Sequence, residues 1–235
     1  MGKQRRVDLS KKDIILFKFL YKHRYANLKA INILYMVKIK TLYARLKKIS
    51  NFGYIKVLKV KNMENIYTLD IKGYQVLKES FENDIKYFNI NINRVALNNN
   101  ANHHLIIAEI GAILNNRNID YEIDLNIKKT KPDWLLVPDL ILIKNKIAFE
   151  IELEYKSMIK YEKKLAALQN TKEINKLIYI VRGNANKFKE KLIKIDEYKG
   201  GKTLDERIIL DETIKKLEVL NLDDFIADID NSDYI

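Results

Sequence analysis

The stretch from Pro138 to Lys156 constrains the fold of this chain most, because it combines apolar runs with several carboxylates. Two apolar runs, at residues 135–143 and 147–153, are separated only by the polar residues Lys144, Asn145 and Lys146. Two apolar, strand-like runs joined by a short polar turn are typical of a β-hairpin. We therefore expect this stretch to form two adjacent antiparallel strands.

The acidic residues of this hairpin suggest a chemical site. Asp139 lies at the start of the first strand, while Glu150 and Glu152 lie within the second. Alternate residues of a strand share a face, so Glu150 and Glu152 point the same way. Buried carboxylates are costly unless a cation meets them, and Asp139, aligned across the hairpin, would complete an oxygen-rich pocket suited to Mg²⁺. With Lys156 just beyond the second run, the pattern is typical of a metal-dependent phosphodiesterase.

Composition excludes several other kinds of site. The chain of 235 residues has no cysteine and three histidines, which excludes a disulfide framework and leaves too few ligands for a zinc site. No signal-like apolar run follows the N-terminus, and no stretch approaches the roughly 18 apolar residues of a membrane span. We therefore expect a cytoplasmic protein with no membrane partner.

The net charge of +12 is unevenly distributed along the chain. Residues 1–80 contain 19 basic and 5 acidic residues, whereas residues 81–235 contain 24 basic and 26 acidic residues. A basic segment joined to a nearly neutral one suggests that the first part binds a polyanion. A generic solubilising surface is the alternative interpretation.

Residues 1–80 have the pattern of a winged helix-turn-helix. Ser10 is a suitable cap for a helix beginning at Lys11, a short helix follows Asn27, and a third helix covers residues 39–51 and ends near Gly53. Strand-like segments at residues 54–60 and 65–69 then form a hairpin. In a winged helix the third helix is the one that enters the major groove of DNA.

The third helix and the following hairpin are rich in side chains that donate hydrogen bonds to phosphates and base edges. The candidate DNA-binding residues are Lys38, Lys40, Thr41, Tyr43, Arg45, Lys47, Lys48, Lys56, Lys59 and Lys61. Double-stranded DNA is the expected partner, and a winged helix used for protein contacts is the alternative. Winged helices often bind as dimers, so a homodimer is also considered, although no heptad or interface pattern demands one.

The second part of the chain has a different order of elements. Residues 81–100 form a polar, Asn-rich linker, and residues 223–235 form an acidic tail that we expect to fray. Between them the pattern predicts helices at 104–114, 157–168 and 186–192, strands at 119–127, 135–143, 147–153, 177–181 and 207–210, and a short strand and turn at 217–225. The core order is αβββαβ, which predicts a PD-(D/E)xK nuclease-like domain with a mixed sheet over residues 101–222. The expected fold class is therefore α+β, with a winged helix followed by this domain.

Several phrases resemble the replication-relaxation (Replic_Relax) family of plasmid-encoded proteins, which join a winged helix to a PD-(D/E)xK-like domain. The resemblance rests on the winged-helix phrases L-K-K-I-S-N-F-G-Y-I at residues 46–55 and Y-T-L-D-I-K-G-Y at residues 67–74, on His104 at the start of its helix, on Pro138-Asp139, and on E-I-E-L-E-Y-K-S at residues 150–157. It covers nearly the whole chain. It implies a role in plasmid replication or conjugative mobilisation, and some relatives are regarded as relaxases.

The implied mechanism is hydrolysis of DNA assisted by Mg²⁺. The candidate catalytic residues are Asp139, Glu150, Glu152, Lys156, His104 and Glu109, of which Asp139 and Glu150 would bind the metal. Lys156 would orient water or stabilise the charged phosphorane, and His104 would act on the leaving oxygen. The register of the (D/E)xK phrase stays open, because Glu152 replaces the lysine two residues after Glu150, whereas Glu154-Tyr155-Lys156 lies at the strand edge.

Other interpretations remain. A relaxase needs a tyrosine nucleophile, and Tyr155 and Tyr161 are only two of fourteen tyrosines. The glutamates beside Lys156, Lys160 and Lys163 are also consistent with a structural ion-pair cluster. The sequence thus leaves open a metal-dependent nuclease or nickase, a non-catalytic replication, mobilisation or transcription factor whose second domain serves dimerisation or docking, and a module for protein contacts alone.

Overall fold

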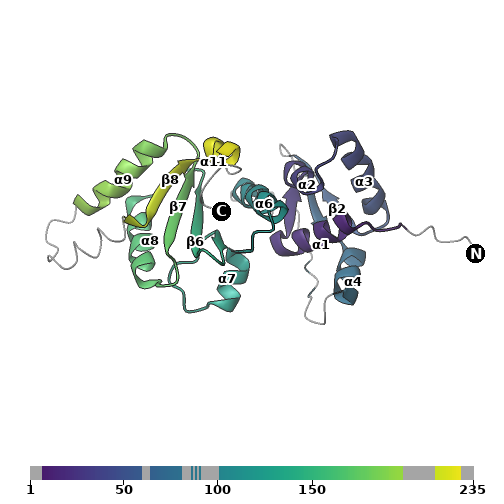
Figure 1. The fold of residues 1–235 in the computed structure, drawn as a ribbon, viewed down its shortest axis with the longest axis horizontal. Helices are drawn as coiled ribbons and strands as arrows, with labels where there is room; N and C mark the ends of the chain where they lie inside the picture. The colour runs from purple at the N-terminus through teal and green to yellow at the C-terminus, as the bar shows by residue number, and fades with distance from the viewer. Residues whose placement is uncertain are drawn as a thin grey trace, which may run out of the picture. The chain divides into compact units, whose positions relative to one another are not determined.

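The computed structural model describes residues 7–59, 64–80, 86, 88, 90, 101–197 and 215–228. It is a mixed α+β structure with two sheets, and its chain contacts divide it into unit 1, residues 1–118, and unit 2, residues 119–235 (Figure 1). The expectations for Lys61, for a strand at residues 207–210 and for the end of the tail at residues 229–235 fall outside the described residues, as does most of the linker at residues 81–100.

Unit 1 contains helices on a small antiparallel sheet. Its elements are α1 (Lys11–His23), β1 (Tyr25–Asn27), α2 (Leu28–Tyr35), α3 (Ile39–Asn51), β2 (Ile55–Leu58), β3 (Ile66–Leu69), α4 (Ile71–Ser80) and α6 (Ala101–Asn116). The strand order is β1-β3-β2, so the expected hairpin β2–β3 gains a third strand, β1, which the sequence analysis did not predict.

The helix boundaries in unit 1 follow from local caps. Ser10 and Asp13 form a capping box at the start of α1, in which each side chain accepts a hydrogen bond from the other residue's backbone N–H. Asn27 caps α2 by accepting from the N–H of Ala30 at 2.9 Å. Beyond α3 the chain turns at Gly53, whose φ of +77° is readily adopted only by glycine. These are the helix limits that the sequence predicted.

Helix α6 belongs to unit 1, whereas the sequence analysis placed residues 101–222 in the second domain. Ala108 and Ala112 are buried in the core that α1, α2 and α3 share. Ala101 and Leu105 pack with Tyr25 and apolar residues of the hairpin. The apolar periodicity of this helix showed that it is buried, but it carried no information about which sheet it packs on.

Unit 2 is built on a mixed five-stranded sheet. Its elements are β4 (Tyr121–Ile123), α7 (Asp124–Thr130), β5 (Leu140–Leu142), β6 (Ile147–Glu152), α8 (Met158–Asn170), β7 (Lys176–Val181), α9 (Ala185–Glu197), β8 (Leu217–Asn221) and α11 (Leu222–Asp228). The strand order is β4-β5-β6-β7-β8, antiparallel from β4 to β6 and parallel from β6 to β8. Helices α8 and α9 make the crossovers between the parallel strands, on the same side of the sheet (Figure 1).

Three expectations for unit 2 were wrong in detail. The strand predicted at residues 119–127 ends at Ile123, because helix α7 begins at Asp124. The helix is favoured by polar residues spaced four apart on its surface, and Lys128 pairs with Asp124 at 3.0 Å. The first strand of the hairpin covers only Leu140–Leu142. The start of the acidic tail is the helix α11, which is held in place because Phe225 is buried against Phe149.

Candidate functional site

Helix α3 of unit 1 has one buried face and one basic, exposed face. Leu42, Leu46 and Ile49 are buried in the core, as their helical spacing predicts. On the opposite side the exposed residues recur three and four apart, so that they form a continuous stripe. This stripe consists of Lys40, Tyr43, Ala44, Lys47 and Asn51.

Further basic residues predicted to bind DNA are also exposed. Lys38 and Thr41 lie at the start of α3, Lys48 lies near its end, and Lys56 and Lys59 lie on or just after β2. Within the described part of the chain, none of the lysines in this set pairs with a carboxylate. Their ammonium groups are therefore available to an anionic ligand.

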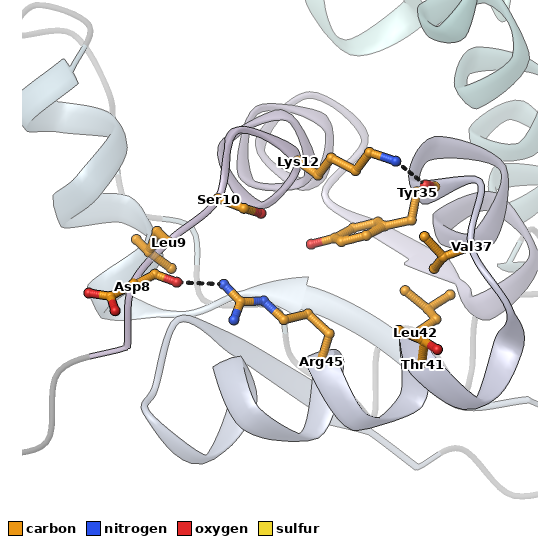
Figure 2. A pocket seen from close by; sticks show the side chains of 9 residues that line it. All are labelled: Asp8, Leu9, Ser10, Lys12, Tyr35, Val37, Thr41, Leu42 and Arg45. Carbon is orange, nitrogen blue, oxygen red and sulfur yellow. Dashed lines mark hydrogen bonds between the residues drawn. The ribbon is translucent and has the colours of Figure 1, made fainter.

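Arg45, which the sequence analysis placed in the same DNA-binding set, differs from these lysines because its head group is already paired. Its guanidinium turns inward and binds the carboxylate of Asp13, with Nε 3.0 Å from Oδ1 and Nη2 on Oδ2. Nη2 also donates to the carbonyl oxygen of Asp8 at 2.8 Å, beside a hollow of about 400 Å³ (Figure 2). Arg45 therefore joins α3 to α1.

Asp13 is completely buried, and its carboxylate accepts hydrogen bonds from several side chains. Besides Arg45, its carboxylate accepts from the hydroxyl of Tyr35 at 2.7 Å and from the hydroxyl of Ser10 at 2.7 Å. Burial alone would raise the pKa of Asp13, but the hydrogen bonds from Arg45, Tyr35 and Ser10 outweigh it and hold the pKa below its ordinary value. The ionised carboxylate therefore ties α1, α2 and α3 together.

His104 and Glu109, predicted as catalytic residues, lie on α6 and have their partners within unit 1. The carboxylate of Glu109 accepts from Asn27 Nδ2 at 2.7 Å and from Lys29 Nζ at 2.7 Å. The ring of His104 packs edge-on against Tyr25, with 6.1 Å between centroids. These contacts give both side chains a structural role in joining α6 to β1 and α2.

The hairpin β5–β6 brings together the carboxylates that the sequence analysis singled out. Leu140 pairs with Phe149, so Asp139 stands opposite Glu150 when this register is continued by one residue. Asp139 Oδ2 accepts the backbone N–H of Ile151 at 2.8 Å. Glu150 and Glu152 are only 2% and 3% exposed and share the face of the sheet that α8 covers.

Two lysines neutralise these glutamates. Lys164, which lies on α8, binds Glu150 Oε2 and is 3.3 Å from Glu152 Oε1. Lys156 Nζ lies 2.8 Å from the same Glu152 oxygen. The candidate site residues of the sequence analysis did not include Lys164, because a helical lysine gives no local sign of the strand that it meets. We call the set Asp139, Glu150, Glu152, Lys156 and Lys164 the carboxylate cluster.

Glu150 is the residue of this cluster whose ionisation is most perturbed. Burial, and next the negative charge of Asp139, raise the pKa of Glu150 to about 8, although Lys164 opposes the shift. One of its oxygens, Oε1, is buried and has no hydrogen-bond partner among the described residues. Burial lowers the pKa of Lys164, but the charges of Glu150 and Glu152 more than reverse this effect and raise it above its ordinary value.

The donor set fits Mg²⁺ in its simplest mode of binding. Among the described residues no three His, Asp or Glu side chains are grouped as a complete protein cage. Mg²⁺ is commonly held by one or two carboxylates, with waters and substrate phosphates as the other ligands. The unpartnered Glu150 Oε1 and the neighbouring Asp139 are ligands of this kind.

The acidic residues of the two candidate registers of the (D/E)xK phrase lie in different places. Glu150 and Glu152 lie in β6, whereas Glu154 is exposed beyond its end.

The two candidate tyrosines differ in exposure. Tyr161 is fully buried and its hydroxyl accepts the backbone N–H of Lys156 at 2.9 Å. Tyr155 is 48% exposed, so it is the more accessible of the two tyrosines.

Comparisons of the chain with protein families, with curated proteins and with solved structures found no match. No helix in the described residues is both long and apolar enough to cross a lipid bilayer. Functional conclusions therefore depend on the geometry of α3 and of the carboxylate cluster.

Proposed function

We propose that the protein binds double-stranded DNA through unit 1, acting as a winged helix in the replication or conjugative mobilisation of a plasmid or mobile element. The observation that carries this proposal is the exposed basic face of α3. The order of α1, α2, α3 and the hairpin β2–β3 supports it, as does the charge of the whole unit. Residues 1–118 contain 22 basic and 8 acidic residues, so the excess of positive charge lies in unit 1.

In this proposal the stripe on α3 lies along the major groove. Tyr43, in the middle of the helix, would meet base edges, because the width of the major groove admits an α-helix. Lys40 and Lys47, about one turn on either side of Tyr43, would neutralise phosphates at the edges of the groove. Lys38 and Lys48 near the helix ends, and Lys56 on the hairpin, would contact phosphates, which fix the position of the protein without reading sequence.

The first prediction concerns this stripe. Replacing both Lys40 and Lys47 with glutamine should weaken binding to a DNA duplex and reduce the dependence of log K on log salt by about 1.8, because each lost phosphate contact removes about 0.9. Fluorescence anisotropy titrations of a labelled duplex at several salt concentrations measure both quantities. Both lysines are exposed, so the fold should be unaffected.

The matched control replaces Lys72 and Lys78 on α4 with glutamine, which removes the same charge. This control should retain a larger salt slope than the α3 variant. Equal slopes for the two variants would mean that the α3 stripe is not the DNA-binding surface.

We also propose that unit 2 is a PD-(D/E)xK-like domain that hydrolyses DNA with Mg²⁺. The order of β4, β5, β6, α8 and β7 supports this assignment, together with the buried carboxylates of β6. Asp139 and Glu150 would hold the ion, which would supply Lewis-acid polarisation of a phosphate and a more acidic water. Lys156 would stabilise the charge that develops on the phosphate, and Glu152 holds Lys156 in position through their ion pair.

A specific observation favours a second candidate function, that of a non-catalytic DNA-binding factor. Lys156 and Lys164 already neutralise the glutamates of β6. The negative charges of Glu150 and Glu152 are therefore balanced by lysines of the protein, as in a structural ion-pair cluster, without a metal ion. Unit 2 would then serve dimerisation or partner docking, while unit 1 carries the function.

The second prediction distinguishes these two candidates. Calorimetric titration with Mg²⁺ or Mn²⁺ should give a binding heat for the wild type that is lost in Asp139→Asn and in Glu150→Gln. Nicking of supercoiled plasmid should be lost in the same variants. Glu154→Gln is the control, because Glu154 is exposed beyond the strand. A wild type that binds duplex DNA but gives no metal heat would establish the non-catalytic function.

A further inference from the structure

A second hollow lies in unit 2, lined by residues outside the carboxylate cluster. It has a volume of about 350 Å³ and is lined by Tyr155, Lys187, Glu190, Lys191 and Lys194. Four of these residues are on α9, and Tyr155 is on the segment between β6 and α8. The wall of this hollow is therefore one aromatic ring and one edge of a basic helix.

Tyr155 presents its ring as a rigid, accessible surface. The ring stacks on Phe188, with 5.6 Å between centroids and an interplanar angle of 15°. Phe188 is itself fully buried and packs against Tyr161 at 5.3 Å and Tyr179 at 5.4 Å. Tyr155 is nevertheless 48% exposed. An aromatic ring fixed on one side and open to solvent is suited to stacking with a planar ligand.

The basic edge of α9 supplies cations at helical spacing. Lys187, Lys191 and Lys194 recur four and three residues apart, so they lie along one side of the helix. Lys191 Nζ is 5.0 Å from the centre of the Tyr155 ring. Within the described residues none of these three lysines forms an ion pair, and Glu190 is the one acidic residue of the lining.

We infer that this hollow binds an unpaired nucleotide of a single-stranded nucleic acid, with its base on Tyr155 and its phosphates along Lys187, Lys191 and Lys194. An aromatic platform beside a row of cations is the combination that binds single strands without reading sequence. In a duplex the faces of the bases are stacked on each other, so a single exposed ring has nothing to stack on. The surface therefore favours a single strand over a duplex.

The position of the hollow relates it to the carboxylate cluster. Tyr155 is next to Lys156, whose Nζ binds Glu152. A strand seated on Tyr155 would place a neighbouring phosphate near Lys156. Delivery of a phosphate to the carboxylate cluster rests on the proposed action of unit 2 on DNA. Binding of the single-stranded nucleic acid to the hollow requires neither the metal nor α3.

The third prediction tests this inference in the full chain, with Lys40→Gln and Lys47→Gln introduced to remove the lysines of the α3 stripe. Binding of a labelled oligothymidylate is followed by fluorescence anisotropy. Tyr155→Ala should weaken binding about tenfold through loss of base stacking, and Tyr155→Phe should retain it because the ring remains. Lys187→Gln with Lys191→Gln should lower the salt slope by about 1.4, since each single-strand phosphate contact contributes about 0.7.

The control is Lys160→Gln with Lys189→Gln, because both lysines are exposed in unit 2 and neither lines the hollow. The inference would be overturned if the protein bound the oligonucleotide with equal affinity with and without Tyr155→Ala. Displacement of the oligonucleotide by thymidine monophosphate at equal nucleotide concentration would also overturn it, because the hollow would then be a site for free nucleotides. Duplex binding without the α3 substitutions should be unaffected by Tyr155→Ala, so failure here is distinct from failure of the α3 proposal.

Discussion

Arg45→Met is expected to reduce the free energy of unfolding of unit 1 by about 3–5 kcal/mol, because removing one partner of a buried ion pair leaves the other charge uncompensated. Asp13 is 0% exposed, so without Arg45 its carboxylate would stay buried with only the neutral donors Tyr35 and Ser10 and the backbone. Domains are typically stable by about 5–15 kcal/mol in total. The variant should therefore lose much of unit 1's stability, and loss of DNA binding would follow from this unfolding.

Urea denaturation followed by far-UV circular dichroism measures this effect, with Lys47→Met as the matched control. Lys47 is exposed on the same helix, so its replacement should change stability by no more than about 0.5 kcal/mol. Trp134, the one tryptophan of the chain, is partly buried against the core of unit 2, and its fluorescence should report little change. Adding Asp13→Asn to Arg45→Met should recover part of the loss, because a neutral amide needs no counterion.

The same ion pair predicts the sign of a pH dependence. The pKa of Asp13 is below its ordinary value in the folded protein, so its contribution to stability is present above the unfolded value and is lost as the pH falls through the folded value. The difference in stability between wild type and Arg45→Met should therefore shrink below about pH 4. A difference that stays constant down to pH 2 would contradict an ionised, paired Asp13.

Lys164→Met is expected to destabilise unit 2 through a related effect, but by less than Arg45→Met destabilises unit 1, because the raised pKa of Glu150 allows this carboxyl group to take up a proton when its cation is removed. Lys164 is the cation that Glu150 and Glu152 share, and in the part of the chain that the structure describes only Glu152 has a second one, in Lys156. The fluorescence of Trp134 during urea denaturation measures the change. Lys163→Met is the control, because Lys163 is the exposed neighbour on α8.

Two further variants make the Lys164 prediction specific. Adding Glu150→Gln should restore part of the stability, because Glu150 is the carboxyl group that loses its lysine partner, whereas Glu152 keeps Lys156. If Asp139 and Glu150 hold Mg²⁺, then millimolar Mg²⁺ should raise the unfolding midpoint of Lys164→Met more than that of the wild type, because a bound ligand stabilises the folded state. Equal stabilities of Lys164→Met and Lys163→Met would show that the carboxylate cluster does not depend on this cation.

The parts of the fold that the sequence predicted are those set by local chemistry. Ser10 and Asn27 cap the helices that follow them, and Gly53 takes a positive φ after α3. What the sequence did not indicate depends on contacts distant along the chain. Strand β1 has three residues and is defined only by its pairing with β3 some forty residues later. In the same way, the unit to which α6 belongs depends on which apolar surface covers it.

The candidate site shows the same division. Alternation along β6 placed Glu150 and Glu152 on one face, and the short turn placed Asp139 opposite Glu150. Arg45 could not be separated from its exposed neighbours by residue type, because an arginine on an amphipathic basic helix suits either an ion pair or a phosphate. It lies one residue before buried Leu46, at the border of the two faces, and this position was the available sign that its head group turns inward.

The position of Lys164 on the crossover helix has a consequence for the order in which unit 2 assembles. During synthesis the strands β4, β5 and β6 emerge before α8, so Glu150 and Glu152 must at first remain hydrated. Strand β6 can enter the sheet interior only as α8 packs on it and brings Lys164. We therefore expect β6, α8 and β7 to fold as one cooperative step, and Lys164→Met to slow refolding of unit 2 more than it accelerates unfolding.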